Sequence, residues 1–81
     1  MTHNEIQEQV IRVIAEITET PIEEIQLDTK LDDVYIDSLD LAEIWTELES
    51  IMKIKIPDPY REPIIVSDIV WYLDGCINTK D

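Results

Sequence analysis

Basic residues are scarce in this sequence. The 81 residues include 6 lysines and arginines against 19 aspartates and glutamates, which gives a formal net charge of −13 and an isoelectric point near 4.1. A surface that binds nucleic-acid phosphates needs a cluster of positive charge, so nucleic acid is excluded as the default partner. The negative balance instead favours basic proteins or cations as partners.

Cysteine, histidine and long apolar runs are also scarce. The one cysteine, Cys76, cannot form an internal disulfide, so nothing in the sequence suggests secretion. Residues 1–8 are polar and acidic, unlike a signal peptide, and no apolar run is long enough to cross a membrane. We therefore expect a cytoplasmic monomer without membrane insertion. We expect Cys76 to be a small core residue and His3 to be an exposed terminal residue.

The apolar residues make up 44% of the chain and recur at helical spacing, as in a folded acidic domain and unlike a disordered acidic tail. Capping residues mark where the helices begin. The three main helices predicted in this way are residues 3–17, opened by a capping box of Thr2 and Glu5; residues 38–52, opened by Asp37; and a last helix that begins at Ser67.

A long connection, residues 18–36, separates the first two helices. Thr20 and Glu23 match a second capping box, which predicts a short helical turn over 21–25, and another short turn is predicted near 59–62. Four apolar side chains are expected to pin the connection to the core: Ile22, Ile25, Leu27 and Leu31. The pattern predicts an all-α fold in a single domain over residues 1–81. We expect a small four-helix bundle, with three main helices plus one short helix and a long loop between the first two helices.

Three carboxylates in this connection raise the question of a calcium site: Asp28, Asp32 and Asp33. An EF-hand loop needs alternating oxygen ligands, a central glycine and a closing glutamate, and these are missing here. We therefore interpret the three residues as solvated turn formers and expect no metal site.

Ser38 stands at the start of the second predicted helix. Asp37 is placed to cap that helix through its carboxylate, and Asp40 falls in the first turn, where negative charge suits the helix dipole. The Ser38 hydroxyl is then free, at a positive helix end that favours a phosphate group. An activated catalytic serine needs a nearby base, and His3 is the one histidine. The residues therefore favour a protein that is not an enzyme, and taken alone they favour Ser38 as a helix-start serine with no other role.

The helix after Ser38 has an apolar and an acidic face by helical spacing. The apolar face consists of Leu41, Ile44, Trp45, Leu48 and Met52, and the acidic face of Asp40, Glu43 and Glu47. The order Asp37-Ser38-Leu39-Asp40, Glu43-Ile44, Leu48-Glu49, Met52 and Ile56-Pro57-Asp58 resembles the acyl carrier protein family. Chain length and helix placement extend this resemblance over essentially the whole sequence.

The resemblance implies that Ser38 carries 4′-phosphopantetheine, attached by a phosphopantetheinyl transferase, and that the thiol of this group holds an acyl group as a thioester. It implies delivery of acyl intermediates to fatty-acid or polyketide-type enzymes. The implied partners, besides the transferase, are acyl-loading and condensing enzymes with basic surfaces. Their implied contact surface, the partner face, consists of Asp37, Leu39, Asp40, Ala42, Glu43 and Glu47. Two alternatives stay open: a carrier of the same fold for aminoacyl or D-alanyl cargo, and an acidic interaction module that is never modified.

The sequence departs from the family pattern just before Ser38. Many members have Gly-x there, whereas Tyr35-Ile36 is a bulky pair that restricts the backbone and suggests a dedicated set of partners. We also expect an expandable apolar space for the acyl chain, lined by Ile14, Ile44, Leu48, Val66, Ile69 and Leu73. Trp45 would narrow this space and favour short or unusual cargo.

Overall fold

A computed structural model of the chain describes residues 1–57 and 61–78. Most of these residues lie in three helices: α1 (His3–Thr18), α2 (Ser38–Met52) and α3 (Val66–Asn78). Two short 3-10 helices, η1 (Ile22–Glu24) and η2 (Leu31–Val34), lie in the connection between α1 and α2. No named strand occurs in the described ranges, and one isolated antiparallel bridge joins Lys30 to Ile65. The all-α prediction is confirmed.

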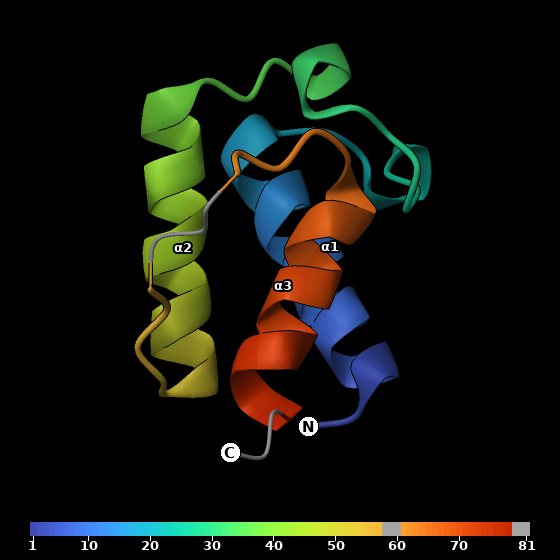
Figure 1. The fold of residues 1–81 in the computed structure, drawn as a ribbon. Coiled ribbons are helices and arrows are strands. Elements are labelled where there is room, and N and C mark those ends of the chain that lie inside the picture. Colours follow the sequence, from blue (N-terminus) through green and yellow to red (C-terminus); the bar gives the residue numbers. More distant parts are fainter. Residues whose placement is uncertain (58–60, 79–81) are drawn as a thin grey trace.

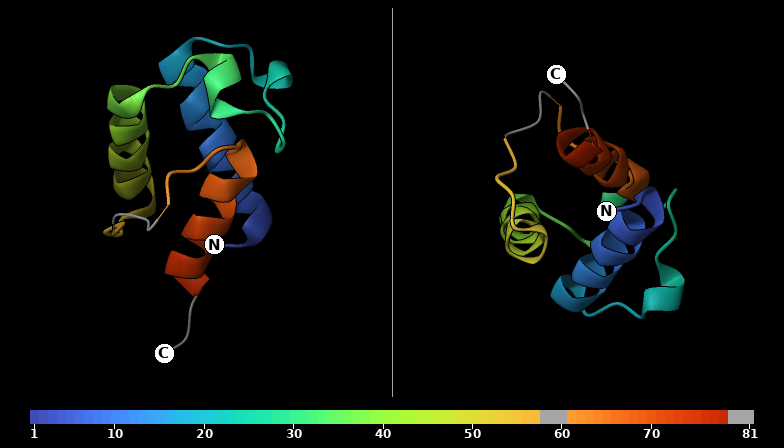
Figure 2. Two further views of the ribbon diagram at one scale, coloured as in Figure 1. Left: turned by 45° about the horizontal axis from the view of Figure 1, so that its top comes forward. Right: turned by 90° about the horizontal axis from the view of Figure 1, so that it is seen from below.

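The helix α1 packs against both α2 and α3 (Figure 1). Seen from below, the three helices form the corners of a triangle (Figure 2). The connection that contains η1 and η2 crosses one end of the bundle and leads into α2 at that end (Figure 1). The start of α2 and the end of α3 therefore lie at opposite ends of the molecule (Figures 1 and 2).

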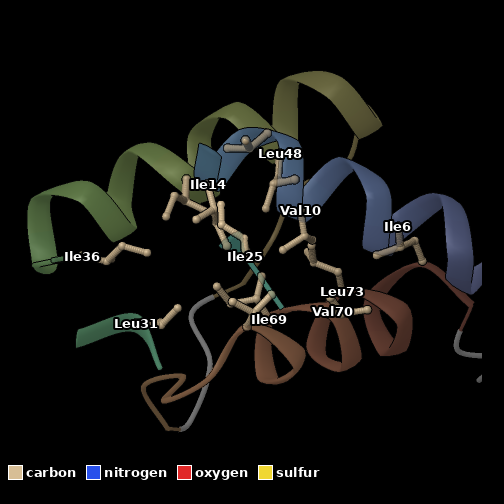
Figure 3. Packing of buried hydrophobic residues seen from close by; sticks show 13 residues of the cluster. Ile6, Val10, Ile14, Ile25, Leu31, Ile36, Leu48, Ile69, Val70 and Leu73 are labelled. Atoms are coloured by element: carbon tan, nitrogen blue, oxygen red, sulfur yellow. The ribbon is translucent and has the colours of Figure 1, made fainter. Parts of the chain in front are cut away.

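The core is aliphatic and closed. All of its buried side chains are isoleucine, valine or leucine, and they come from the three helices and the connection (Figure 3). Each side chain that was expected to line an acyl space is 0% exposed: Ile14, Ile44, Leu48, Val66, Ile69 and Leu73. Because protein interiors pack about as densely as organic crystals, these side chains fill the space between the helices.

The starts of α1 and α2 follow the predicted local chemistry. The Thr2 hydroxyl oxygen accepts a hydrogen bond from the Glu5 N–H at 3.2 Å, and the Glu5 carboxylate accepts one from the Thr2 N–H at 2.8 Å. These bonds hold the pKa of Glu5 below its ordinary value. The bounds predicted for α2 match the observed ones, and α1 ends one residue later than predicted.

The start of α3 corrects the prediction that Ser67 is its N-cap. The helix begins at Val66, and the carboxylate of Asp68 accepts hydrogen bonds from the N–H groups of Ile64 and Ile65 at 2.9 and 3.1 Å. The N–H of Ser67 donates to the carbonyl of Leu27 at 2.8 Å. The connection between α1 and α2 thus provides a hydrogen-bond acceptor for an N–H group at the start of α3, in place of a serine cap.

The connection itself was predicted in part. The turn at η1 forms, but the second capping box is wrong. Pro21 precedes η1 without a side-chain cap bond, because α1 runs to Thr18 and the Thr18 hydroxyl donates to that of Thr20 at 2.9 Å. Of the four expected anchors, Ile25 and Leu31 are buried, whereas Ile22 and Leu27 are exposed. The first two residues of the turn predicted near 59–62 lie outside the described residues, and the last two, Arg61 and Glu62, are not helical.

Two further expectations are wrong at the far end of the bundle. His3 is half-buried: its Nδ1 lies 2.7 Å from Oδ2 of Asp74, and its ring centroid is 4.4 Å from that of Trp71. Cys76 is exposed and does not belong to the core. Helical spacing placed Cys76 near the apolar face of α3, but α1 and α2 do not cover it there.

Candidate functional site

Ser38 is the first residue of α2 and is exposed. The predicted cap is confirmed, since Oδ1 of Asp37 accepts a hydrogen bond from the Asp40 N–H at 2.9 Å. The Asp40 carboxylate in turn accepts a hydrogen bond from the Asp37 N–H at 3.5 Å, so the two residues form a complete capping box. No hydrogen bond within the described part of the chain uses the Ser38 hydroxyl. The cap therefore leaves that hydroxyl available at the positive end of α2.

The residues just before Ser38 hold it in place. Tyr35 ends η2 in the left-handed conformation, with φ 61° and ψ 35°. Ile36 follows, is buried, and donates its N–H to the carbonyl of Leu31 at 3.1 Å. The N–H of Leu31 donates in turn to the carbonyl of Ile64 at 2.9 Å. The approach to Ser38 is thus anchored to the chain that enters α3.

Tyr35 occupies the position where many members of the resembled family have glycine. A left-handed backbone costs a residue with a Cβ atom about 1–2 kcal/mol, a cost that glycine avoids. Tyr35 therefore carries this cost three residues ahead of Ser38. The Tyr35 side chain is 88% exposed, so it projects into solvent within three residues of Ser38.

A pocket of about 280 Å³ opens beside Ser38. Its lining comes from η2, the start of α2 and the chain ahead of α3: Leu31, Asp32, Ile36, Asp37, Ser38, Leu41, Glu62 and Pro63. Sequence reasoning missed Glu62 and Pro63, which reach the site from far along the chain. No local pattern indicates this proximity, because the docking of the connection onto residues 64–67 creates it.

The two faces predicted for α2 are present. Ile44 and Leu48 are buried and Leu41, Trp45 and Met52 are half-buried. On the predicted partner face, Asp37, Leu39, Ala42, Glu43 and Glu47 are exposed, and Asp40 is half-buried through its part in the cap. Leu39 is 78% exposed, so the acidic groups surround an apolar side chain next to Ser38.

Neither a candidate metal site nor a membrane-spanning helix occurs in the ranges that the structure describes. Among residues 1–57 and 61–78, no group of three histidine, cysteine, aspartate or glutamate side chains is placed to hold a metal ion, and this includes Asp28, Asp32 and Asp33. None of the helices described is both long and apolar enough to span a membrane.

Comparison with known proteins shows what kind of site this is. Residues 8–59 match the model of a family described as "Phosphopantetheine attachment site", so the group carried is covalently bound 4′-phosphopantetheine. A relative named "Acyl carrier protein" from Campylobacter fetus subsp. fetus is 33% identical, and the match covers 84% of this chain and 91% of the relative. Another of the same name, from Rickettsia bellii, is 37% identical, and the match covers 84% of this chain and 81% of the relative. A third, from Campylobacter hominis, is 32% identical and covers 94% of this chain and 99% of its own length. No solved structure matched the chain. The chain belongs to the acyl carrier protein family, whose members are carriers and not catalysts.

The residues around Ser38 fit such a group. The first N–H groups of an α-helix lack partners within the helix, and here those of Asp40 and Leu41 are already bound to Asp37. The N–H groups of Ser38 and Leu39 are left to face a phosphate, which a helix start favours. Leu31, Ile36 and Leu41 give the adjoining pocket an apolar side suited to the methyl-bearing part of pantetheine.

Proposed function

We propose that Ser38 is the attachment residue for 4′-phosphopantetheine, and that residues 1–81 act as one carrier domain for acyl thioesters in fatty-acid or polyketide-type synthesis. The observation that carries the proposal is the exposed Ser38 hydroxyl at the capped start of α2, beside a partly apolar pocket. When bound, the group supplies a terminal thiol that holds the acyl group as a thioester.

Loading requires a phosphopantetheinyl transferase and coenzyme A. The Ser38 Oγ forms a bond to the phosphorus that carries pantetheine, the bond to adenosine 3′,5′-bisphosphate breaks, and the hydroxyl proton passes to a base outside this chain. The role of Asp37 is to hold the start of α2 by accepting the Asp40 N–H, so that the hydroxyl stays exposed.

The acidic partner face suits a carrier that visits several basic enzymes in turn. Charge raises the rate of encounter more than it raises affinity, which suits a carrier that must bind and leave its partners quickly. Leu39, at 78% exposure, gives the contact an apolar centre next to the attachment residue. The cytoplasmic location and the monomeric state stay predictions.

The attachment residue is tested with two serine variants on the same helix. Wild type, Ser38→Ala and Ser50→Ala are each incubated with coenzyme A and a broad-specificity transferase, and the mass of each is measured. Ser50 is exposed on α2, so it is the matched control. Wild type and Ser50→Ala should gain the phosphopantetheine mass, while Ser38→Ala stays helical by circular dichroism and gains none. A Ser38→Ala protein that still gains this mass would refute the assignment. The thioester found on protein from its native host distinguishes acyl from aminoacyl or D-alanyl cargo.

A further inference from the structure

A groove beside α2 is open to solvent and has room for cargo, whereas the core is filled by buried side chains. Next to the pocket at Ser38 lies a second pocket of about 460 Å³, lined by Trp45, Arg61, Glu62, Pro63, Ile64, Asp68 and Tyr72. The two pockets share Glu62 and Pro63 in their linings, so they adjoin each other, and together they are here called the Trp45 groove.

The groove runs along a single face of α2. Ser38, Leu41 and Trp45 are spaced by three and four positions, which places them in line on the helix surface. At 1.5 Å rise per residue, Trp45 lies about 10 Å beyond Ser38 along the helix. An extended phosphopantetheine arm is longer than this, so a thioester anchored at Ser38 can reach Trp45. Residues 61–64 also line it.

Two aromatic rings close the far end of the groove. Trp45 and Tyr72 pack edge to face, with ring centroids 5.8 Å apart and an interplanar angle of 68°. The Tyr72 hydroxyl donates to the carbonyl of Pro57, which anchors the second ring. Both side chains are half-buried, so this end of the groove is an aromatic wall with part of its surface accessible to a ligand.

We propose that cargo attached at Ser38 lies in the Trp45 groove and that this groove selects compact acyl groups, with an aromatic acyl group as the best fit. The inference rests on the proposed function and specifies its cargo. A flat or short apolar group gains contact with Trp45, Pro63 and Ile64. A long straight chain meets the aromatic wall and extends beyond the groove into solvent, since entry to the core would require the six core side chains, which are 0% exposed here, to move apart.

The test follows Trp45 directly. The chain has two tryptophans, so Trp71→Phe makes Trp45 the single fluorescent tryptophan. This variant is loaded from benzoyl-, hexanoyl- and dodecanoyl-coenzyme A by a broad-specificity transferase, and loading is verified by mass. The benzoyl and hexanoyl forms should change the Trp45 emission and raise the melting temperature by about 4 °C over the form that carries a free thiol. The dodecanoyl form should be no more stable than the hexanoyl form.

A second variant tests the aromatic wall. Trp45→Leu keeps the site apolar but removes the large ring, so the benzoyl group should lose its stabilising effect. A dodecanoyl chain should then stabilise the protein more than a hexanoyl chain does. The fluorescence result does not depend on this variant, because it uses protein with Trp45 intact.

The outcomes separate the two proposals. A chain that gains no mass from any coenzyme A thioester, with either the broad-specificity transferase or the transferase of its native host, refutes the proposed function and this inference with it. A chain that loads at Ser38 with unchanged Trp45 emission refutes the inference alone. The same holds if dodecanoyl cargo gives the greatest stability in the protein with Trp45, because the chain would then have entered the core.

Discussion

The Nδ1 atom of His3 lies 2.7 Å from Oδ2 of Asp74, so the first turn of α1 is bound to the last part of α3. The Trp71 ring packs on the same histidine. The Asn78 side chain donates to the other oxygen of Asp74. The bond from Asn78 first, and then the contact with His3, hold the pKa of Asp74 below its ordinary value.

This lowered pKa predicts a defined dependence of stability on pH. A carboxyl group whose pKa is lowered by folding contributes fully above its unfolded pKa, near 3.8, and the contribution is lost as the pH falls through the folded pKa. Asp74→Asn should therefore melt at a lower temperature than wild type near neutral pH. The two melting temperatures should converge as the pH approaches about 2. Asp28→Asn removes the same charge from an exposed turn and is the control. A gap between wild type and Asp74→Asn that is constant with pH would contradict the prediction.

Tyr35→Gly should stabilise the protein. The substitution removes the cost of a Cβ atom at φ 61°, and the greater freedom of glycine in the unfolded chain offsets part of that gain. We expect a net gain of about 1 kcal/mol, or about 4–8 °C in melting temperature for a domain of this size. Tyr35→Ala removes the exposed ring but keeps the Cβ atom, so it should melt close to wild type. Equal effects of the two substitutions would show that the backbone is not the cause.

Glu43→Lys should slow loading by a phosphopantetheinyl transferase. Reversing an exposed charge on the partner face reduces attraction to a basic enzyme, and we expect the second-order rate to fall about threefold or more at low salt. The loss should shrink at higher salt because screening shortens the reach of the charge to about 10 Å at 0.1 M. Asp40 is unsuitable for this test, since its carboxylate also takes part in the cap.

The matched control for that experiment is Glu8→Lys. Glu8 is exposed on α1, and its reversal changes the net charge by the same amount. If Glu8→Lys and Glu43→Lys slow loading equally, the effect comes from overall charge, and the partner face is not where the transferase binds.

Salt should raise the melting temperature of the unmodified chain. A net charge of −13 on 81 residues places the folded state under self-repulsion, which screening relieves. The rise should be found between low ionic strength and about 0.1 M, measured by circular dichroism in sodium chloride. A melting temperature that stays flat or falls over this range would rule out repulsion as a significant cost.

Local chemistry explains the part of the fold that the sequence predicts. The capping pairs Thr2 with Glu5 and Asp37 with Asp40 involve residues three positions apart, and each forms from its own segment without help from the rest of the chain. The helix spacing of the apolar residues then places Ile44 and Leu48 in the core. The position of Ser38 at an exposed helix start follows from the same local signals.

The parts that were missed depend on contacts between distant segments. The connection accepts a hydrogen bond from the Ser67 N–H at the start of α3, and no spacing rule within α3 can indicate this contact. His3 is bound because α3 passes beside the start of α1, and Glu62 reaches the pocket because residues 64–67 dock on the connection. Each of these depends on tertiary arrangement, which a single helix pattern does not encode.

The exposed position of Cys76 has a practical consequence for handling the carrier. Its sulfur lies near the end of α3, and the start of α2 lies at the opposite end of the bundle (Figure 1). A reagent that titrates thiols in the native protein will therefore count one group per chain before loading and two after it. The difference gives the loaded fraction directly. Under oxidising conditions, a disulfide between two copies through Cys76 would join them by their α3 ends and leave both loading sites pointing outward.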